Sequence, residues 1–351
     1  MPVPARLGRL LAQACVALMV LSAAGRLAAA ELRVTSPAEL LAALAAATGG
    51  ETILLAPGDY GRLSLNERTP FPVAFPETVT LASADPGRPA RFHSLGLNGV
   101  QNLALRSLLF DYTFDPADRH NKRISMIVNA TNIRIEDSEF RGDEAQGVSE
   151  VADGFGWGIG LGVRKSEGIT LEGNTFHRWH RAAIIGHSDR IALRRNEVHD
   201  VRSDGFNFAA VQGVIIEDNH IHGFRASRAS KDHADMIQFW TDKTSRPTTD
   251  VVIRNNVLNA GHGSYTQSIF MRNEEVDTRR AGREMYYRNI EITGNVIINA
   301  HLHGISVGEA DGGVIANNTL LRSPFTTTPL RAGNIRFPSI RVNRMSDRVR
   351  V

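Results

Sequence analysis

The sequence predicts an all-β chain, a single-stranded parallel β-solenoid with a short helix at its N-terminal end. Short segments alternate apolar and polar residues, as half-buried strands do, and they end repeatedly in Asn or Gly. They also recur at a nearly fixed spacing, without helical segments between them. Because one such repeat cannot bury its apolar residues alone, we expect successive repeats to stack into one continuous core.

Residues 1–30 have the layout of a secretory signal peptide. Basic residues precede an apolar run from Ala14 to Ala24, which is too short to span a bilayer, and alanines 28–30 form a small-residue cleavage site. Cleavage would remove three arginines, no acid and the one cysteine, leaving 37 basic and 37 acidic residues. We therefore expect a periplasmic or secreted protein with no disulfide, no membrane contact after cleavage and no nucleic-acid partner.

Residues 31–351 are predicted to form one domain that begins with a capping helix. Ser36 is a suitable N-cap, Pro37 follows in the first turn, and Gly49-Gly50 ends a helix over Ala38–Ala47. Residues 51–60 then predict a strand and a turn. We expect the helix to cover the open end of the solenoid and protect its edge.

The repeats share the pattern apolar-x-apolar-x-x-Asn-x-apolar. Clear copies begin at Ile133, Ile169, Ile191, Val214, Val251, Ile290 and Gly313, after a degenerate copy from Leu103 to Phe110. From Asn174 onward the Asn positions lie 22, 23, 37, 39 and 23 residues apart, so the long steps carry insertions, near 225–233, 241–250 and 274–288. We expect each Asn to adopt left-handed turn geometry and to bond to the Asn above and below it.

The segment Gly50–Tyr60 and these rungs resemble the pectin-lyase-like, right-handed parallel β-helix proteins. The resemblance covers roughly residues 34–345. It implies a right-handed parallel β-helix. It is less specific for activity, because that family includes lyases, hydrolases, epimerases and non-catalytic adhesins.

Each rung holds a second strand ahead of its Asn. We expect the third and fifth residues of this strand to face the core and the fourth to face solvent. We expect the first residues to form a corner column of Trp157, Arg181, Asp204, Asp235, Gln267 and His303. The fourth residues would form a column of Gly160, Ile184, Asn207, Gln238, Phe270 and Ser306, and Trp240 and Arg272 begin a third. Column neighbours should lie about 5 Å apart, one strand spacing.

This face is the predicted site. The candidate catalytic residues are Lys231, His233, Asp235, Arg272, Arg181 and Asp204, and the candidate substrate-binding residues are Asn207, Gln238, Trp240, His180 and His303. Walls formed by the insertions would make an open groove, which suits a polymer. A purely structural role stays open for Asp204 and Asp235, which would then bond turn backbone or Arg181.

The family resemblance favours a uronic-acid polysaccharide as the substrate. Abstracting the weakly acidic proton on carbon 5 requires a cation beside the sugar carboxylate and a base. Arg272, Arg181 or a cation held by Asp204 and Asp235 would neutralise the carboxylate, and His233, Lys231 or His180 would take the proton. Expelling the 4-linked oxygen gives a lyase, our first expectation, and reprotonation on the other face gives an epimerase. Residues 231–235 are also similar to the Asp-Pro-His-Asp motif of periplasmic alginate epimerases, without its proline and with different spacing.

Other functions remain open. Asp204 and Asp235 on neighbouring rungs would suit a retaining glycoside hydrolase, whose carboxyl groups lie about 5–5.5 Å apart. A non-catalytic glycan-binding solenoid would use the same groove without a base. The sequence identifies no cofactor other than a candidate Ca²⁺ at the same two aspartates. We expect a monomer that binds an acidic polysaccharide, and we expect His220 and His222 to be exposed turn residues.

Overall fold

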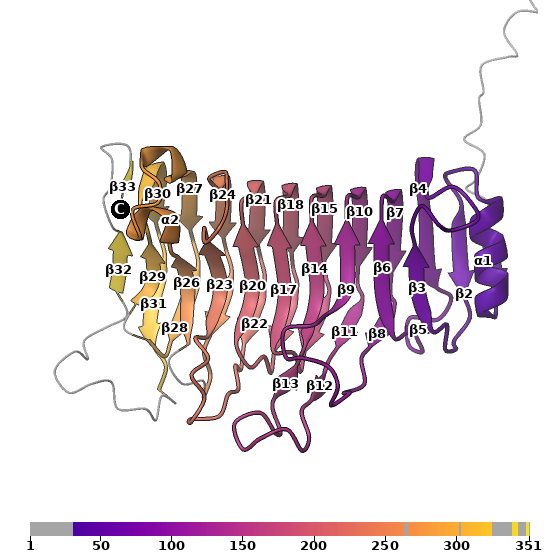
Figure 1. The fold of residues 1–351 in the computed structure, drawn as a ribbon, viewed down its shortest axis with the longest axis horizontal. Coiled ribbons are helices and arrows are strands. Elements are labelled where there is room, and N and C mark those ends of the chain that lie inside the picture. Colours follow the sequence, from indigo (N-terminus) through magenta and orange to yellow (C-terminus); the bar gives the residue numbers. More distant parts are fainter. Residues whose placement is uncertain (1–30, 263–265, 302, 325–338, 343–348, 351) are drawn as a thin grey trace, which may run out of the picture.

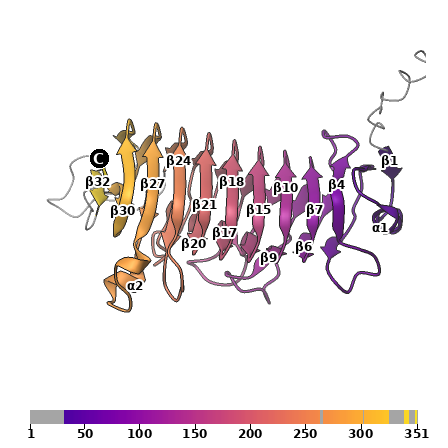
Figure 2. The same cartoon turned by 90° about the horizontal axis from the view of Figure 1, so that it is seen from above.

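The computed structural model describes residues 31–262, 266–301, 303–324, 339–342 and 349–350. Over these residues the chain coils through three long parallel sheets, which we call A, B and C, and so forms a parallel β-helix (Figures 1 and 2). The predicted all-β solenoid is confirmed. The predicted signal peptide lies outside the described residues, and no helix within them has the length and apolar character needed to cross a bilayer.

Each turn of the coil runs from sheet C to sheet A and then to sheet B. Sheet A contains β1 (Glu31–Val34), β2 (Thr52–Leu55), β4 (Ala74–Ser83), β7 (Gln101–Arg106), β10 (Thr131–Glu136), β15 (Glu167–Glu172), β18 (Asp189–Arg194), β21 (Gln212–Glu217), β24 (Thr249–Arg254), β27 (Tyr287–Thr293), β30 (Ala310–Ala316) and β33 (Val349–Arg350). Sheet B contains β5 (Arg91–Phe92), β8 (Leu109–Asp111), β11 (Glu139–Arg141), β16 (Thr175–His177), β19 (Glu197–His199), β22 (His220–His222), β25 (Val257–Asn259), β28 (Val296–Asn299) and β31 (Thr319–Arg322). Sheet C contains β3 (Arg62–Leu65), β6 (Ser94–Asn98), β9 (Arg123–Val128), β14 (Ile159–Arg164), β17 (Arg181–Gly186), β20 (Asp204–Ala209), β23 (Asp235–Trp240), β26 (Gln267–Met271), β29 (His303–Val307) and β32 (Ser339–Val342).

The repeat alignment gives the register of sheet A correctly. Ile133 pairs with Ile169, which pairs in turn with Ile191, and the later copies continue in the same register. These apolar residues are buried in one core that runs along the coil. Phe110, Phe140 and Phe176 stack inside it with ring centroids 4.7 and 4.5 Å apart.

The Asn ladder lies in the turn between sheets A and B. The side-chain amide of Asn196 donates to Asn219 at 3.0 Å, and Asn219 donates to Asn256 at 2.9 Å, as predicted. The expected left-handed geometry is wrong for the ladder Asn itself, because the positive φ falls one residue earlier, for example at Arg195 (50°) and Asp218 (58°). The preceding residue reverses the chain, and the buried Asn amide can then point along the stack.

Helix α1 (Pro37–Ala46) covers the N-terminal end of the coil beside β2 (Figure 1). Ser36 caps it by accepting a hydrogen bond from the Glu39 backbone N–H at 3.3 Å. Leu40 and Leu44 are buried in the core of the first turn. The predicted capping helix is therefore confirmed.

The three predicted insertions flank sheet C. Residues 223–234 connect sheet B to sheet C, while residues 241–248 and 272–286 connect sheet C to sheet A and include helix α2 (Glu274–Asp277) and the 3₁₀-helix η1 (Arg283–Met285). Residues 142–158 form a further insertion that was not predicted. It holds the antiparallel hairpin of β12 (Asp143–Glu144) and β13 (Gly156–Trp157). Loops therefore lie at both ends of the sheet C strands.

Candidate functional site on sheet C

The predicted columns exist over most of sheet C. Arg181 pairs with Asp204 and Asp235 pairs with Gln267 in the corner column, while Asn207, Gln238 and Phe270 pair in succession in the fourth-residue column. The Trp157 rung is misplaced by two residues, since Ile159 pairs with Arg181 and Gly162 pairs with Ile184. A shift of two residues keeps the same side chains facing inward, so the alternation alone could not detect it.

An exposed histidine lies over a buried carboxylate at the start of β23. The His233 ring is 56% exposed, and its Nδ1 lies 2.8 Å from Oδ2 of Asp235, which is 0% exposed. Gln267 donates through Nε2 both to Asp235 Oδ1 at 3.0 Å and to His233 Nε2 at 2.8 Å. Because Nε2 accepts this bond, the neutral ring carries its proton on Nδ1 and donates it to Asp235.

A second buried aspartate lies one rung before this pair. Asp204 accepts from Arg181 Nε at 2.5 Å and from the Asp235 backbone N–H at 3.2 Å. Its side chain is 2% exposed. Gln238 also donates to Asp235, at 2.8 Å, so hydrogen-bond donors surround both carboxylates.

The electrostatics of the His233–Asp235 pair favour a strong base at the surface. The hydrogen bond with Asp235 raises the pKa of His233, and the charge of Asp235 adds to this effect. Burial raises the pKa of Asp235 and the nearby Asp204 raises it further, although His233 acts in the opposite direction. Asp235 therefore positions His233 and increases its basicity.

The loop before β23 fixes the position of His233. The Ser203 hydroxyl donates to the His233 carbonyl oxygen at 3.2 Å. Asp232 accepts from Arg202 at 2.7 Å and from Ser230 at 2.5 Å. Although burial opposes it, these bonds and the nearby His180 lower the pKa of Asp232, which stays ionised and holds the loop against the preceding rung.

The other predicted site residues differ in their exposure and in their contacts. Lys231 is exposed on the loop before His233, and Arg272 is 51% exposed at the end of β26, where it contacts Asp277 at 3.2 Å. His180 is buried, with its ring nearest to Asp232, so it is not presented to a polymer on this face. The half-buried His303 lies at the start of β29.

Asn207 and Trp240 differ in their exposure. Asn207 faces outward in its column but is covered by its neighbours, and its Nδ2 has no hydrogen-bond partner among the described residues. Trp240 is half-buried and forms one wall of a pocket of about 380 Å³ on sheet C. Arg123 and Arg164 also line this pocket.

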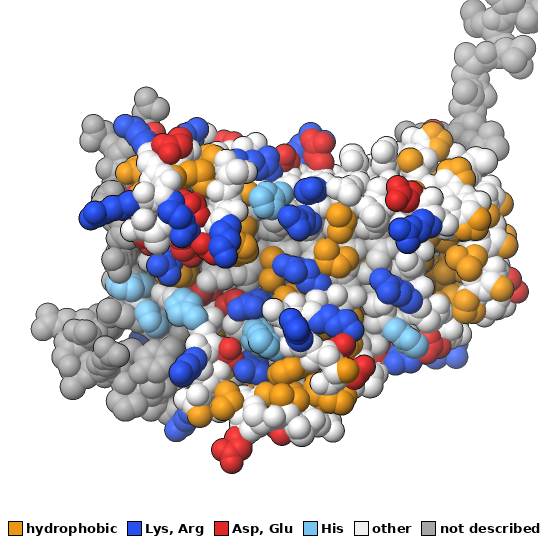
Figure 3. Space-filling view, in the orientation of Figure 1, with side chains coloured by type: hydrophobic (Ala, Val, Ile, Leu, Met, Phe, Trp, Pro, Cys, Tyr) orange, Lys and Arg blue, Asp and Glu red, His pale blue; other side chains and the backbone are white. Residues whose placement is uncertain are grey.

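The pocket is rich in positive charge. Arg123, Arg164 and Lys243 line it, together with Asp242, which pairs with Arg280. No carboxylate among the described residues forms an ion pair with Arg123 or Arg164. Burial lowers the pKa of Arg123, and the nearby Arg164 and Arg181 lower it further. Lys and Arg side chains spread widely over this face (Figure 3), which therefore suits an anionic ligand.

The sequence matches one known protein family. A family described as "Right handed beta helix region" matches residues 124–320, more than half of the sequence. The chain belongs to the right-handed beta helix family. No curated protein sequence matches it.

Solved right-handed β-helix structures share the fold at low sequence identity. An alginate lyase from Paenibacillus sp. str. FPU-7 has a TM-score of 0.53 and 14% identity, covering 92% of this chain and 99% of its own. The surface adhesin PfbA of Streptococcus pneumoniae has a TM-score of 0.46 and 13% identity, with 88% of each chain covered. The A-module of the Azotobacter vinelandii mannuronan C-5 epimerase AlgE6 has a TM-score of 0.45 and 15% identity, covering 90% of this chain and 95% of its own. The alginate lyase, with a TM-score above 0.5, shares the fold, and at 14% identity the likeness shows nothing beyond the fold.

The two aspartates of this β-helix, as arranged, do not fit a Ca²⁺ ion. Calcium takes six to eight oxygen ligands. Here the carboxylate oxygens of Asp204 and Asp235 accept hydrogen bonds from Arg181, from backbone N–H and from side chains including Gln267. A Ca²⁺ requirement remains a prediction.

The sequence analysis missed some residues of this β-helix site. Gln267 stood in the corner column, but a neutral amide gave no reason to choose it, and its two bonds depend on the position of a loop residue. Arg123 and Arg164 were missed because the β9 rung was not recognised and the β14 rung was displaced. Placing residues 123–128 and 159–164 as successive second strands would have brought both arginines onto the predicted face.

Proposed function

We propose that this protein is a lyase that cleaves a uronic-acid polysaccharide, with His233 as the base. The observation that carries the proposal is the exposed His233 ring held over the buried Asp235 on a face rich in cations. An alginate lyase with the same fold supports this substrate class. The proposal includes a periplasmic or secreted location, as the predicted signal peptide implies.

In the proposed reaction the neutral His233 accepts the carbon-5 proton on Nε2. Gln267, which donates to that nitrogen in the free protein, gives up this bond when the sugar binds and keeps its bond to Asp235. The electron pair of the broken C–H bond forms the double bond between carbons 4 and 5. The 4-linked oxygen departs with its bonding electrons and takes a proton from Lys231 or water. The Asp235 carboxylate stabilises the resulting imidazolium.

The reaction also requires a cation beside the sugar carboxylate. Negative charge develops on the sugar carboxylate when the carbon-5 proton leaves, and a nearby cation lowers the energy of that state. Arg272 follows β26, one rung after that of His233, and Arg181 begins β17, two rungs before it; both are partly exposed. We assign them to this carboxylate, and we assign Arg123, Arg164 and Trp240 to neighbouring sugars of the chain.

The burial of both aspartates argues against the hydrolase alternative. A retaining glycoside hydrolase needs two carboxyl groups that touch the scissile bond. Asp204 and Asp235 are 2% and 0% exposed, and their oxygens already accept hydrogen bonds from the protein. The His233 ring, by contrast, is 56% exposed. The structure therefore favours proton abstraction over a carboxylate pair.

The test is an assay on alginate, pectate and glycosaminoglycans, with and without Ca²⁺. A lyase produces an unsaturated sugar, which is measured by ultraviolet absorbance, whereas an epimerase exchanges the carbon-5 proton with solvent, which proton NMR detects. The His233→Ala variant should lose turnover by about 10²–10⁴-fold and still bind polymer. The matched control is His93→Ala, which removes an exposed histidine paired with Asp59 at 2.9 Å. New reducing ends without absorbance, or full activity in His233→Ala, would refute the proposal.

A further inference from the structure

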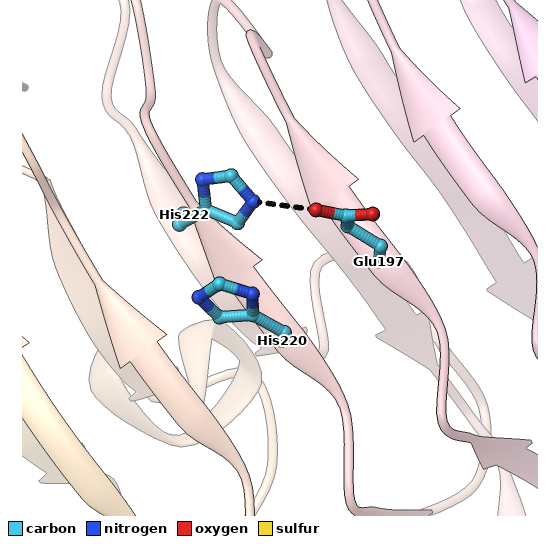
Figure 4. Close-up of side chains that lie close together, drawn as sticks. All are labelled: Glu197, His220 and His222. Atoms are coloured by element: carbon cyan, nitrogen blue, oxygen red, sulfur yellow. Dashed lines mark hydrogen bonds and ion pairs between the residues drawn. The ribbon is translucent and has the colours of Figure 1, made fainter.

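A cluster of two histidines and one glutamate lies on sheet B, away from the candidate site on sheet C (Figure 4). His220 and His222 belong to β22 and flank the buried Ile221, so both rings face outward. Glu197 on β19 is the register partner of His220. The two histidines were expected in a turn, but they lie on a strand, where the preceding rung supplies a carboxylate.

The spacing of the three side chains matches that of ligands around one ion. Their ligand atoms all lie within 4.8 Å of one another. His222 Nε2 and Glu197 Oε1 are 3.0 Å apart and point toward each other. Ligands bound at about 2.0–2.2 Å from a shared ion are themselves about 3 Å apart, so this pair already has the right separation. His220 is exposed, and rotation of its side chain can bring its ring to the same point.

We propose that Glu197, His220 and His222 form a binding site for a divalent transition-metal ion, for which Zn²⁺ is the probe. Two imidazole nitrogens and one carboxylate oxygen are a donor set typical of Zn²⁺. Ca²⁺ and Mg²⁺ prefer oxygen ligands alone and should bind poorly. The cluster opens to solvent, so water completes the coordination. The ion replaces the proton between His222 and Glu197, which passes to solvent.

Neighbouring histidines hold the His222 ring in place. The His199 ring stacks on His222 at 5.4 Å with planes 17° apart, and His177 stacks on His199 at 5.0 Å and 7°. His199 is anchored by Asp200 at 2.8 Å. Such outer contacts fix the orientation of a ligand ring before the metal arrives.

A bound ion would join two successive turns of the coil. Glu197 lies on β19 and both histidines lie on β22, so binding links strands that are adjacent in sheet B. Because this arrangement exists only in the folded chain, the ion should stabilise the fold. The inference does not depend on the reaction proposed for sheet C.

The experiment is Zn²⁺ titration of untagged, chelator-treated protein by calorimetry, with thermal unfolding in parallel. We expect the wild-type protein to bind a Zn²⁺ equivalent that is lost in His220→Ala and in Glu197→Gln. The unfolding midpoint should rise by a few degrees with Zn²⁺ in the wild type and not in these variants. Ca²⁺ at the same concentration should give neither effect.

His93→Ala is the matched control, because it removes an exposed histidine, paired with Asp59, that lies outside the cluster and outside the histidine stack. It should retain the Zn²⁺ equivalent. Circular dichroism before titration shows whether each variant is folded, and His220 is the preferred position because its ring is exposed. The proposal is overturned if the wild type binds no Zn²⁺, or if folded His220→Ala and Glu197→Gln bind as much as the wild type.

Discussion

At the residue scale, the proposed lyase uses Asp235 to act through His233 rather than on the substrate. Its carboxylate is fully buried and bonded to His233, Gln238 and Gln267. An ionised group in this position is costly to bury, and it is tolerated because donors surround it. His233, by contrast, reaches the surface, and the buried Asp235 raises the pKa of its ring.

Asp235→Asn should therefore change the pH dependence of the proposed lyase. Asp235 raises the pKa of His233, so His233 becomes the neutral base only above its ordinary titration range. Removing the negative charge lowers this pKa, and the acid limb of kcat/KM should move to lower pH. The maximal rate should fall by less than the roughly 10²–10⁴-fold expected when the base itself is removed. Rates measured across pH test both effects.

The control for this substitution is Asp59→Asn, which alters another aspartate–histidine pair, with His93 at 2.9 Å. Its pH profile should match that of the wild type. An Asp235→Asn profile with an unmoved acid limb would mean that His233 is not the group that titrates.

Arg181→Met should lower the stability of the fold. Arg181 donates to Asp204, whose side chain is 2% exposed, so the variant leaves a buried carboxylate short of a partner. A cost of about 1–3 kcal/mol is expected from urea unfolding. Adding Asp204→Asn removes the charge and should recover much of the loss. Equal stability of Arg181→Met and wild type would show that the pair contributes nothing.

At the element scale, the turn between sheets A and B depends on the Asn ladder. Asn219 is buried, donates to Asn256 at 2.9 Å and accepts from Asn196 at 3.0 Å. Asn219→Ala removes the central member and leaves buried polar groups unpaired, at a cost of about 1–3 kcal/mol in unfolding free energy. The comparison is Asn98→Ala, an exposed asparagine bonded to Asn129 at 3.2 Å, which should cost much less. Similar losses in both variants would contradict a special role for the ladder.

The strands were predictable from the sequence where turn residues marked them. From β15 to β30 each sheet A strand precedes a ladder Asn, so one alignment gave the register of this part of the sheet. The sheet C strands follow loops of variable length and have no such mark. The hairpin insertion therefore hid the register at Trp157, which pairs with Asp143 instead of entering the sheet.

The site was predictable to the extent that it follows the strand register. Asp204 and Asp235 fall in one column because both begin a strand, and the sequence showed this. The contacts of His233 and the burial of His180 depend on how the loops fold back, which involves partners such as Ser203 and Asp232. No periodic pattern encodes these contacts.

At the scale of the whole molecule, the stacking of rungs determines the length of sheet C. Every turn adds one strand to this sheet, so its face lengthens with the coil (Figure 1). Loops from residues 223–234 and 241–248 lie at opposite ends of its strands. If the proposed lyase binds its polymer along this face, a chain can bind at any position along it, and early products should be oligomers of many sizes.

The cationic face should make polymer binding depend on charge and salt. The double substitution Arg123→Gln and Arg164→Gln removes two arginines that form no ion pair with any carboxylate among the described residues. The stability of the fold should therefore change little. If each contributes about 1 kcal/mol of contact with the anionic chain, KM should rise by about thirtyfold while kcat changes little. Added salt should raise the wild-type KM and affect the double variant less, because screening acts on the same contacts.

Arg134→Gln, on sheet A, is the control and should leave both constants unchanged. A double variant with wild-type KM and salt dependence would show that the polymer does not lie across this part of sheet C.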